Sequence, residues 1–294
     1  MNIGIVVCFF SPQNYSLPRK HFAGTIDWLL RYNLPISVAQ ATLPGQAPQP
    51  IPKKCRSIVY PNCDYIFYKE NLWNLGTQLL PDCDVFLFLD TDIRLTGNWL
   101  DIFKDVMEDA DVCQPFHVSR WLDKSGDLFQ QRPNCASAIE DGQPLDLAKY
   151  HPGFGIGIHR DAFERLGGIY QYMLPGGGDS AFWSSFDRTK EGQRMRQYRA
   201  EKKMLNIRCP LYEEYRENAL SLNLTVRACR PTKAIHKWHG HRKRRQYTTR
   251  ELLFPRLENE NPACYTRKDG LLMFSRPAPK AKQFWENRLE DGDE

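Results

Sequence analysis

The sequence has no long hydrophobic run. Its longest apolar stretch covers residues 5–10 and is strand-sized, whereas a membrane-spanning helix needs about 20 apolar residues. The chain opens directly into this stretch, without a basic region or a cleavage site, so we expect no signal peptide and no membrane partner.

Paired cysteines are also lacking. The nine cysteines are an odd number, and no C-x-x-C spacing occurs. A disulfide framework or a structural zinc site normally shows regular, paired spacings. We therefore expect reduced thiols, as in a cytoplasm-like compartment.

Two common nucleotide-binding signatures are missing. No G-x-G-x-x-G follows the first apolar run, which argues against a nicotinamide-binding domain, and the P-loop pattern is absent. The net charge of +5 is mild, so it permits an anionic partner without requiring one. Hydrophobic residues make up 41% of the chain and charged residues 26%, which is typical of a globular protein.

The first hundred residues alternate between β-like and α-like patterns. Continuous apolar, β-branched runs predict strands that are buried on both faces, and apolar residues at helical spacing predict amphipathic helices. We expect strands at 3–10, 36–43, 56–61 and 85–89, and helices at 21–32 and 72–80. This alternation favours an α/β protein with a mostly parallel sheet flanked by helices.

Two carboxylates, Asp90 and Asp92, end the apolar run VFLFL. Side chains two residues apart can point the same way on an extended backbone, and ligands bind beyond the carboxyl ends of such strands. Two buried carboxylates repel each other unless something neutralises them, and a divalent cation such as Mn²⁺ or Mg²⁺ would do so. Alternatively, the pair caps the next helix or forms surface salt bridges.

The segment VFLFLDTD resembles the D-x-D motif of GT-A glycosyltransferases, which hold a nucleotide-diphosphate sugar through a metal ion. The stretch before it, residues 68–93, resembles the same family. The resemblance implies that Asp90 faces the ribose or the metal and that Asp92 ligates the metal. It also implies a GT-A domain over residues 1–253. Residues 254–294 would be a C-terminal extension or tail.

A second motif is the glycine-rich segment that ends in Asp179. The glycines at 176–178 allow a close backbone approach to a ligand. The segment resembles the loop of inverting GT-A enzymes, whose carboxylate removes the proton of the acceptor hydroxyl. Asp179 is the candidate base by this resemblance, or an acceptor-positioning residue if configuration is retained. An N-cap role is the plain alternative. Residues expected to contact the acceptor are His151, Phe154, Gly177, Gly178 and Trp183.

A third motif, IHKWHGHRKRRQY, supplies histidines late in the domain. By the same resemblance one of them completes the metal shell, with His239 first, His236 second and His241 also open. An exposed polar histidine is the alternative. Arg242 and the three basic residues after it could neutralise a diphosphate leaving group, contact nucleic-acid phosphates, or be simply solvated.

The loop after the first strand is implied to hold the nucleobase and ribose of the donor, through Phe10, Ser11 and Pro12. The pattern KEN-x-x-N, FLDTDI, QPF, HPGFGIGI, GGGD and WHG resembles a viral and bacterial GT-A branch. Some members of that branch are associated with glucosylation of hydroxymethylated pyrimidines in DNA, alongside TET/JBP-type oxygenases.

The branch implies UDP-glucose as the donor and DNA as the acceptor, in a cytoplasmic protein (the host cytoplasm if the chain is viral). A base embedded in a duplex would have to be flipped out, and Trp121 and Trp183 are conceivable stacking partners. The basic segment 188–203 could contact a phosphate backbone. A glycosyltransferase acting on a protein or a cell-surface glycan, or a non-catalytic nucleic-acid-binding module, stays open. The sugar, the nucleobase and the oligomeric state are undetermined.

Overall fold

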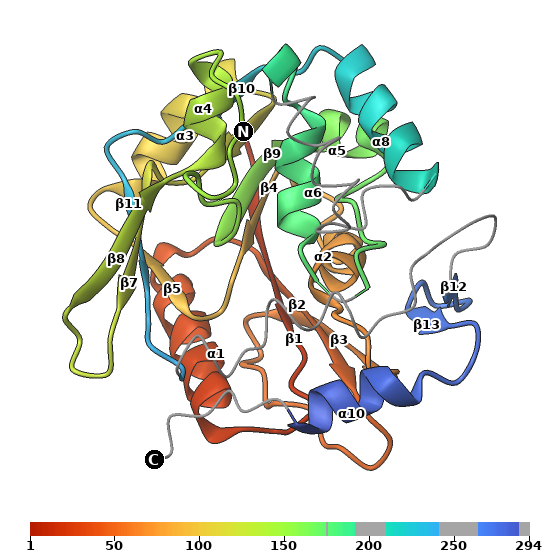
Figure 1. The fold of residues 1–294 in the computed structure, drawn as a ribbon. Helices are drawn as coiled ribbons and strands as arrows, with labels where there is room; N and C mark the ends of the chain where they lie inside the picture. Colours follow the sequence, from red (N-terminus) through yellow and green to blue (C-terminus); the bar gives the residue numbers. More distant parts are fainter. Residues whose placement is uncertain (175, 192–209, 241–263, 288–294) are drawn as a thin grey trace.

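The structure, a computed structural model, describes residues 1–174, 176–191, 210–240 and 264–287. Its centre is a seven-stranded sheet with the order β10-β6-β9-β4-β1-β2-β3 (Figure 1). Within this sheet β9 runs antiparallel to both neighbours, and the other pairs are parallel. The strands are β1 (Ile3–Phe9), β2 (Ile36–Thr42), β3 (Arg56–Pro61), β4 (Val85–Leu89), β6 (Val112–Gln114), β9 (Gly155–His159) and β10 (Val226–Ala228).

The apolar strands β1, β2 and β4 are buried on both faces, and their alternate residues point to opposite sides of the sheet. In β4, Leu87 packs on the face covered by α1 (Ser16–Leu29) and α3 (Trp99–Asp109), whereas Phe86 and Phe88 pack on the other. That second face is covered by α2 (Lys69–Thr77), α4 (Cys135–Glu140), α5 (Arg160–Leu166), α6 (Gly178–Ser185) and α8 (Pro210–Ser221).

A smaller four-stranded sheet has the order β5-β11-β7-β8. It consists of β5 (Ile93–Leu95), β7 (Val118–Leu122), β8 (Leu128–Pro133) and β11 (Lys233–His236). Its strand β11 pairs antiparallel with β5, so His236 lies opposite Ile93. This pairing brings a late part of the chain next to the segment that follows β4.

The described part of the C-terminal segment is packed against the rest of the protein. It forms a hairpin of β12 (Cys264–Thr266) and β13 (Leu272–Phe274), followed by α10 (Pro279–Asn287). Leu272 and Trp285 are buried in one hydrophobic cluster with Tyr68 and Leu72. The boundary between a domain at 1–253 and a tail at 254–294 stays a prediction.

The predicted α/β architecture is confirmed, and the predicted strands match β1 to β4 within one residue at each end. The helix expected at 21–32 begins earlier, at Ser16, and a 3₁₀ turn, Leu30–Tyr32, follows it. The helix expected at 72–80 covers Lys69–Thr77. Pattern alone did not indicate the antiparallel β9 or the second sheet. Among the described residues, no helix has the length and apolar character needed to cross a membrane.

Candidate active site

Several predicted site residues lie at the carboxyl edge of the central sheet. Asp90 directly follows β4, and Phe10 directly follows the adjacent parallel strand β1. Open α/β sheets bind ligands at this edge. The topology therefore brings the D-x-D segment and the loop after β1 to the same edge.

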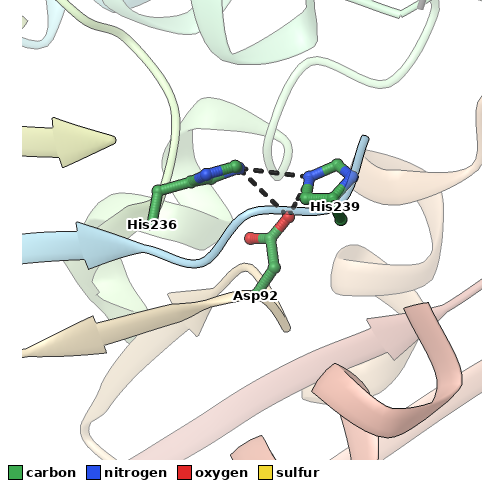
Figure 2. A group of neighbouring side chains, drawn as sticks. All are labelled: Asp92, His236 and His239. Carbon is green, nitrogen blue, oxygen red and sulfur yellow. Dashed lines mark hydrogen bonds and ion pairs between the residues drawn. The ribbon is translucent and has the colours of Figure 1, made fainter. Parts of the chain in front are cut away.

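Three side chains at this edge form a group that could hold a metal ion: Asp92, His236 and His239 (Figure 2). Oδ2 of Asp92 lies 2.7 Å from Nε2 of His239 and 3.3 Å from Nε2 of His236, and the two ring nitrogens are 3.2 Å apart. These separations are near the roughly 3 Å expected between adjacent ligands that each sit about 2.1 Å from one ion.

The electrostatics of this group suit a cation. Burial raises the pKa of Asp92, but His236 and His239 outweigh it and hold the pKa well below its ordinary value, so the carboxylate is charged. Its Oδ1 is buried and has no hydrogen-bond partner among the described residues, which a bound ion would remedy. One carboxylate and two imidazoles suit a first-row transition metal better than Mg²⁺, which prefers oxygen ligands.

Asp90 does not belong to this group. Its carboxylate accepts a hydrogen bond from the backbone N–H of Phe154 at 3.2 Å, and its Oδ1 lies 3.6 Å from Nζ of Lys69. Burial raises the pKa of Asp90, with Asp92 and Asp179 adding to the rise and Lys69 opposing it. The two aspartates of the D-x-D segment therefore have different partners in this structure.

Asp179 lies in the first turn of α6 and is not its N-cap, because Gly177 holds that position with φ of 100°. Its Oδ1 accepts a hydrogen bond from the N–H of Ser180 at 2.7 Å, and its Oδ2 accepts one from Lys69 at 3.1 Å. Burial raises the pKa of Asp179, but Lys69 and His151 outweigh it, so the pKa lies below its ordinary value. The carboxylate is therefore ionised, as a general base must be.

Two glycines leave room for this carboxylate and its neighbours. A Cβ on Gly153 would lie 2.9 Å from Oδ2 of Asp179 and 3.2 Å from Nε2 of His151. A Cβ on Gly178 would overlap the carboxyl group of Glu70. Side chains at these two positions would therefore displace the groups that surround the candidate base.

The residues expected at the acceptor form a compact aromatic group. The rings of His151 and Phe154 have centroids 4.1 Å apart, and Trp121 packs at 4.6 Å from His151. Burial lowers the pKa of His151 to about 3, so its imidazole is neutral. Trp183 is fully buried, and its indole N–H donates to the carbonyl of Pro152 at 2.8 Å. In this structure Trp183 therefore contacts the loop that carries His151.

The residues expected at the donor follow β1. Phe10 packs edge-on against Tyr68 at 5.0 Å and against Trp285 at 5.7 Å. Ser11 is buried, and its carbonyl accepts a hydrogen bond from the side chain of Gln46 at 2.7 Å. Pro12 is half-buried in the same loop. Donor contacts at these positions stay predictions.

Some predicted residues lie outside the described part of the chain. These are His241, Arg242 and the three basic residues after it, together with most of the basic segment 188–203.

The structure brings two other residues into the candidate site, and the sequence did not rank either of them first. His236 was the second choice for a ligand, and pairing with β5 brings it to Asp92. Lys69 opens the KEN-x-x-N motif, but no sequence pattern reveals its partners.

No protein-family model and no curated protein matches the sequence. The chain is similar to the crystal structure of A197 from STIV, with 14% identity and a TM-score of 0.34 over 63% of this chain and 78% of that one. It is also similar to HddC from Yersinia pseudotuberculosis, with 10% identity and a TM-score of 0.32 over 56% and 79% of the two chains.

A third similar structure is glucosyl-3-phosphoglycerate synthase from Mycobacterium tuberculosis, solved in complex with Mn²⁺, UDP and phosphoglyceric acid. The identity is 11% and the TM-score is 0.38. The match covers 64% of each chain, which is less than two thirds of that protein's length.

Proposed function

We propose that the protein is a metal-dependent glycosyltransferase that moves a sugar from a nucleotide-diphosphate sugar to a hydroxyl group. One observation carries this proposal. Asp92, His236 and His239 converge at the carboxyl edge of the sheet, and the ionised Asp179 lies on the same edge, linked to Asp90 through Lys69. A cation site near a charged candidate base suits transfer of a group from a diphosphate to a hydroxyl, because the cation can neutralise the leaving group and the base can accept the proton.

In this proposal different residues bind the cation, accept the proton and contact the acceptor. Asp92, His236 and His239 would hold the cation, which when bound would neutralise the charge of a diphosphate leaving group. Asp179 would accept the proton of the acceptor hydroxyl as that oxygen attacks the anomeric carbon. His151 is neutral and lies close to Asp179. Its imidazole would offer the acceptor a hydrogen-bonding group beside the apolar rings of Phe154 and Trp121.

A non-catalytic nucleic-acid-binding module is less well supported, because such a protein has no need of a cation site or of a half-buried, ionised carboxylate. Binding to phosphates requires basic side chains on the surface. It does not explain why Asp92 is enclosed by two histidines or why the half-buried Asp179 is paired with Lys69.

The test of transferase activity is hydrolysis or transfer with a panel of nucleotide sugars in the presence of Mn²⁺. We expect turnover with UDP-glucose, and we expect Asp179→Asn to bind UDP and Mn²⁺ normally while losing transfer by about 100-fold or more, the contribution typical of a general base. No turnover with any nucleotide sugar, together with unchanged melting in UDP and Mn²⁺, would contradict the proposal. Normal transfer by Asp179→Asn would contradict the role of that residue alone.

For the acceptor, we propose 5-hydroxymethylpyrimidine in DNA, a choice supported by the sequence resemblance of the motifs. The experiment incubates the protein with labelled UDP-glucose and either hydroxymethylated or unmodified DNA of the same sequence. Label that enters only the hydroxymethylated DNA supports this acceptor. Label that appears instead on protein or glycan favours a glycosyltransferase with that acceptor and leaves the proposed reaction class intact.

A further inference from the structure

Lys69 is surrounded by carboxylates from three separate parts of the chain. Its Nζ lies 3.1 Å from Oδ2 of Asp179, 3.6 Å from Oδ1 of Asp90 and 3.8 Å from Oε1 of Glu70. Asp90 follows β4, Asp179 lies in the first turn of α6, and Glu70 is the next residue of α2. The lysine side chain is only 14% exposed, so these ion pairs are shielded from water.

We propose that Lys69 is a positioning residue for transfer, which acts by holding the carboxylate of Asp179 toward the end of the site where Asp90 and the metal group lie. This inference rests on the proposed function, in which Asp179 is the base. Lys69 does not itself take up or release a proton in the reaction.

The contacts of Asp179 explain why this lysine matters. Oδ1 accepts a hydrogen bond from the backbone N–H of Ser180 within its own helix, so this contact fixes the carboxylate only relative to α6. Oδ2 is held by Lys69, which comes from a different helix, and it lies over Gly153, where a Cβ would approach to 2.9 Å. Among the described residues, Lys69 provides the one ion pair to Asp179. The direction of the carboxylate therefore depends on Lys69 together with Ser180, and only Lys69 ties it to another helix.

The ammonium group of Lys69 stays charged in these surroundings and also contacts an aromatic ring. Burial lowers the pKa of Lys69, but Asp179, Asp90 and Glu70 together outweigh it, so the pKa is raised well above its ordinary value and the ammonium stays charged. Its Nζ also lies 5.0 Å from the centre of the Trp73 ring, at a distance suited to a cation–π contact.

The remaining residues of the KEN-x-x-N motif fix α2 to the segment that leads into the glycine-rich loop. Asn71 donates to the side chain of Gln171 at 2.8 Å and to the carbonyl of Gly270 at 3.2 Å. Asn74 donates to the carbonyl of Ile169 at 2.8 Å and accepts a hydrogen bond from its N–H at 2.9 Å. The helix that carries Lys69 is thus tied to residues just before the loop that carries Asp179.

The experiment compares Lys69→Met, which keeps an unbranched stem but removes the charge, with Lys69→Arg, which keeps the charge. Lys104→Met, a surface substitution on α3, is the matched control. Thermal melting measures whether each variant is folded, and calorimetric binding of UDP with Mn²⁺ measures whether its donor site is intact.

We expect Lys69→Met to lower kcat by roughly 10- to 100-fold, because a misplaced catalytic group costs rates of this order. We expect the KM for the donor to change by less than about fivefold in the same variant. Lys69→Arg should recover most of the loss.

A double-mutant cycle with Asp179→Asn separates positioning from a general structural role. If Lys69 acts through Asp179, adding Lys69→Met to Asp179→Asn should change the residual transfer rate by less than about threefold. A further loss as large as that in the wild-type background would overturn the inference, as would a kcat within about threefold of wild type for Lys69→Met alone. Should Lys69→Met fail to fold, Lys69→Gln enters the same cycle. A wild-type protein without any turnover would instead overturn the proposed function.

Discussion

Oδ2 of Asp92 lies 2.7 Å from Nε2 of His239, although the two residues are 147 positions apart along the chain. The distance depends on β11, whose antiparallel pairing with β5 returns the chain to the end of β4. His236, the last residue of β11, completes the group. A carboxylate held between two imidazoles is an arrangement that a cation would stabilise further.

Replacing Asp92 should therefore strongly weaken metal binding. A change in the surroundings of a metal ligand already costs about 10- to 100-fold in affinity, so removing the ligand in Asp92→Asn should weaken Mn²⁺ binding by at least about 100-fold. His236→Gln and His239→Gln should each weaken it as well. The measurement is calorimetric titration with Mn²⁺, Mg²⁺, Zn²⁺ and Fe²⁺, with Asp105→Asn, an exposed position on α3, as the control.

Equal Mn²⁺ affinity for wild type and Asp92→Asn would contradict this assignment. Tighter binding of Mg²⁺ than of Mn²⁺ would also contradict it, because that order indicates an all-oxygen shell rather than one with two imidazoles.

Glu70 should make the stability of the protein depend on pH. Burial raises the pKa of Glu70 to about 7 from its ordinary value of 4.5, although Lys69 opposes the rise. The folded protein thus holds this proton more tightly than the unfolded chain does. The stabilisation is complete below pH 4.5 and is lost as the pH rises toward 7.

Glu70→Gln should remove this dependence. The variant should resemble wild type near pH 5 and should be more stable at pH 8 by about 1–3 kcal/mol, since each unit of pKa is worth about 1.4 kcal/mol. Urea unfolding at the two pH values measures the difference, with Glu164→Gln, whose side chain is 62% exposed, as the control. Stability differences that are the same at both pH values would contradict the raised pKa.

Gly153 should be sensitive to even a small side chain. In Gly153→Ala the new methyl group would meet Oδ2 of Asp179 at 2.9 Å, so the carboxylate has to move. We expect transfer to fall by roughly 10- to 100-fold while binding of UDP with Mn²⁺ changes little. Gly24→Ala is the matched control, because a Cβ there meets its nearest atom at an ordinary 3.6 Å. Loss of donor binding equal to the loss of transfer would show that the donor site had been disturbed instead.

The sequence predicted the strands well because their apolar runs are local signals. VFLFL reads as a buried strand from composition alone, and Asp90 and Asp92 necessarily follow it. The partners of these carboxylates are non-local, and no pattern reveals them. That one cation neutralises both aspartates stays a prediction. In this structure Asp90 pairs with Lys69, whereas Asp92 pairs with two histidines.

The choice among the histidines was uncertain for the same reason, because their partners are also distant in the sequence. The spacing of His236 and His239 is compatible with many arrangements, and their convergence on Asp92 requires β11 to lie between β5 and β7. Lys69 stands 110 residues before Asp179, so only the packing of α2 beside α6 makes them partners. Long-range pairs of this kind depend on the finished fold.

The C-terminal helix α10 should contribute substantially to stability. Trp285 is 3% exposed, its ring stacks on Phe67 at 6.2 Å, and its indole N–H donates to the carbonyl of Tyr65 at 3.0 Å. Trp285→Ala would leave a cavity and an unpaired carbonyl, which should lower the free energy of unfolding by about 3–5 kcal/mol. Urea unfolding measures this, and Phe129→Ala, at a position that is 66% exposed, should change it by less than about 0.5 kcal/mol.

The same substitution tests whether the C-terminal segment supports the donor site. Trp285 packs edge-on against Phe10, so its loss should loosen the loop after β1. At a temperature where the variant is folded, UDP should bind more weakly to Trp285→Ala and normally to Phe129→Ala. If the free energy of unfolding of Trp285→Ala is nearly that of wild type, α10 contributes little to stability. If it is destabilised but binds UDP normally, the packing against Phe10 serves the fold and not the donor.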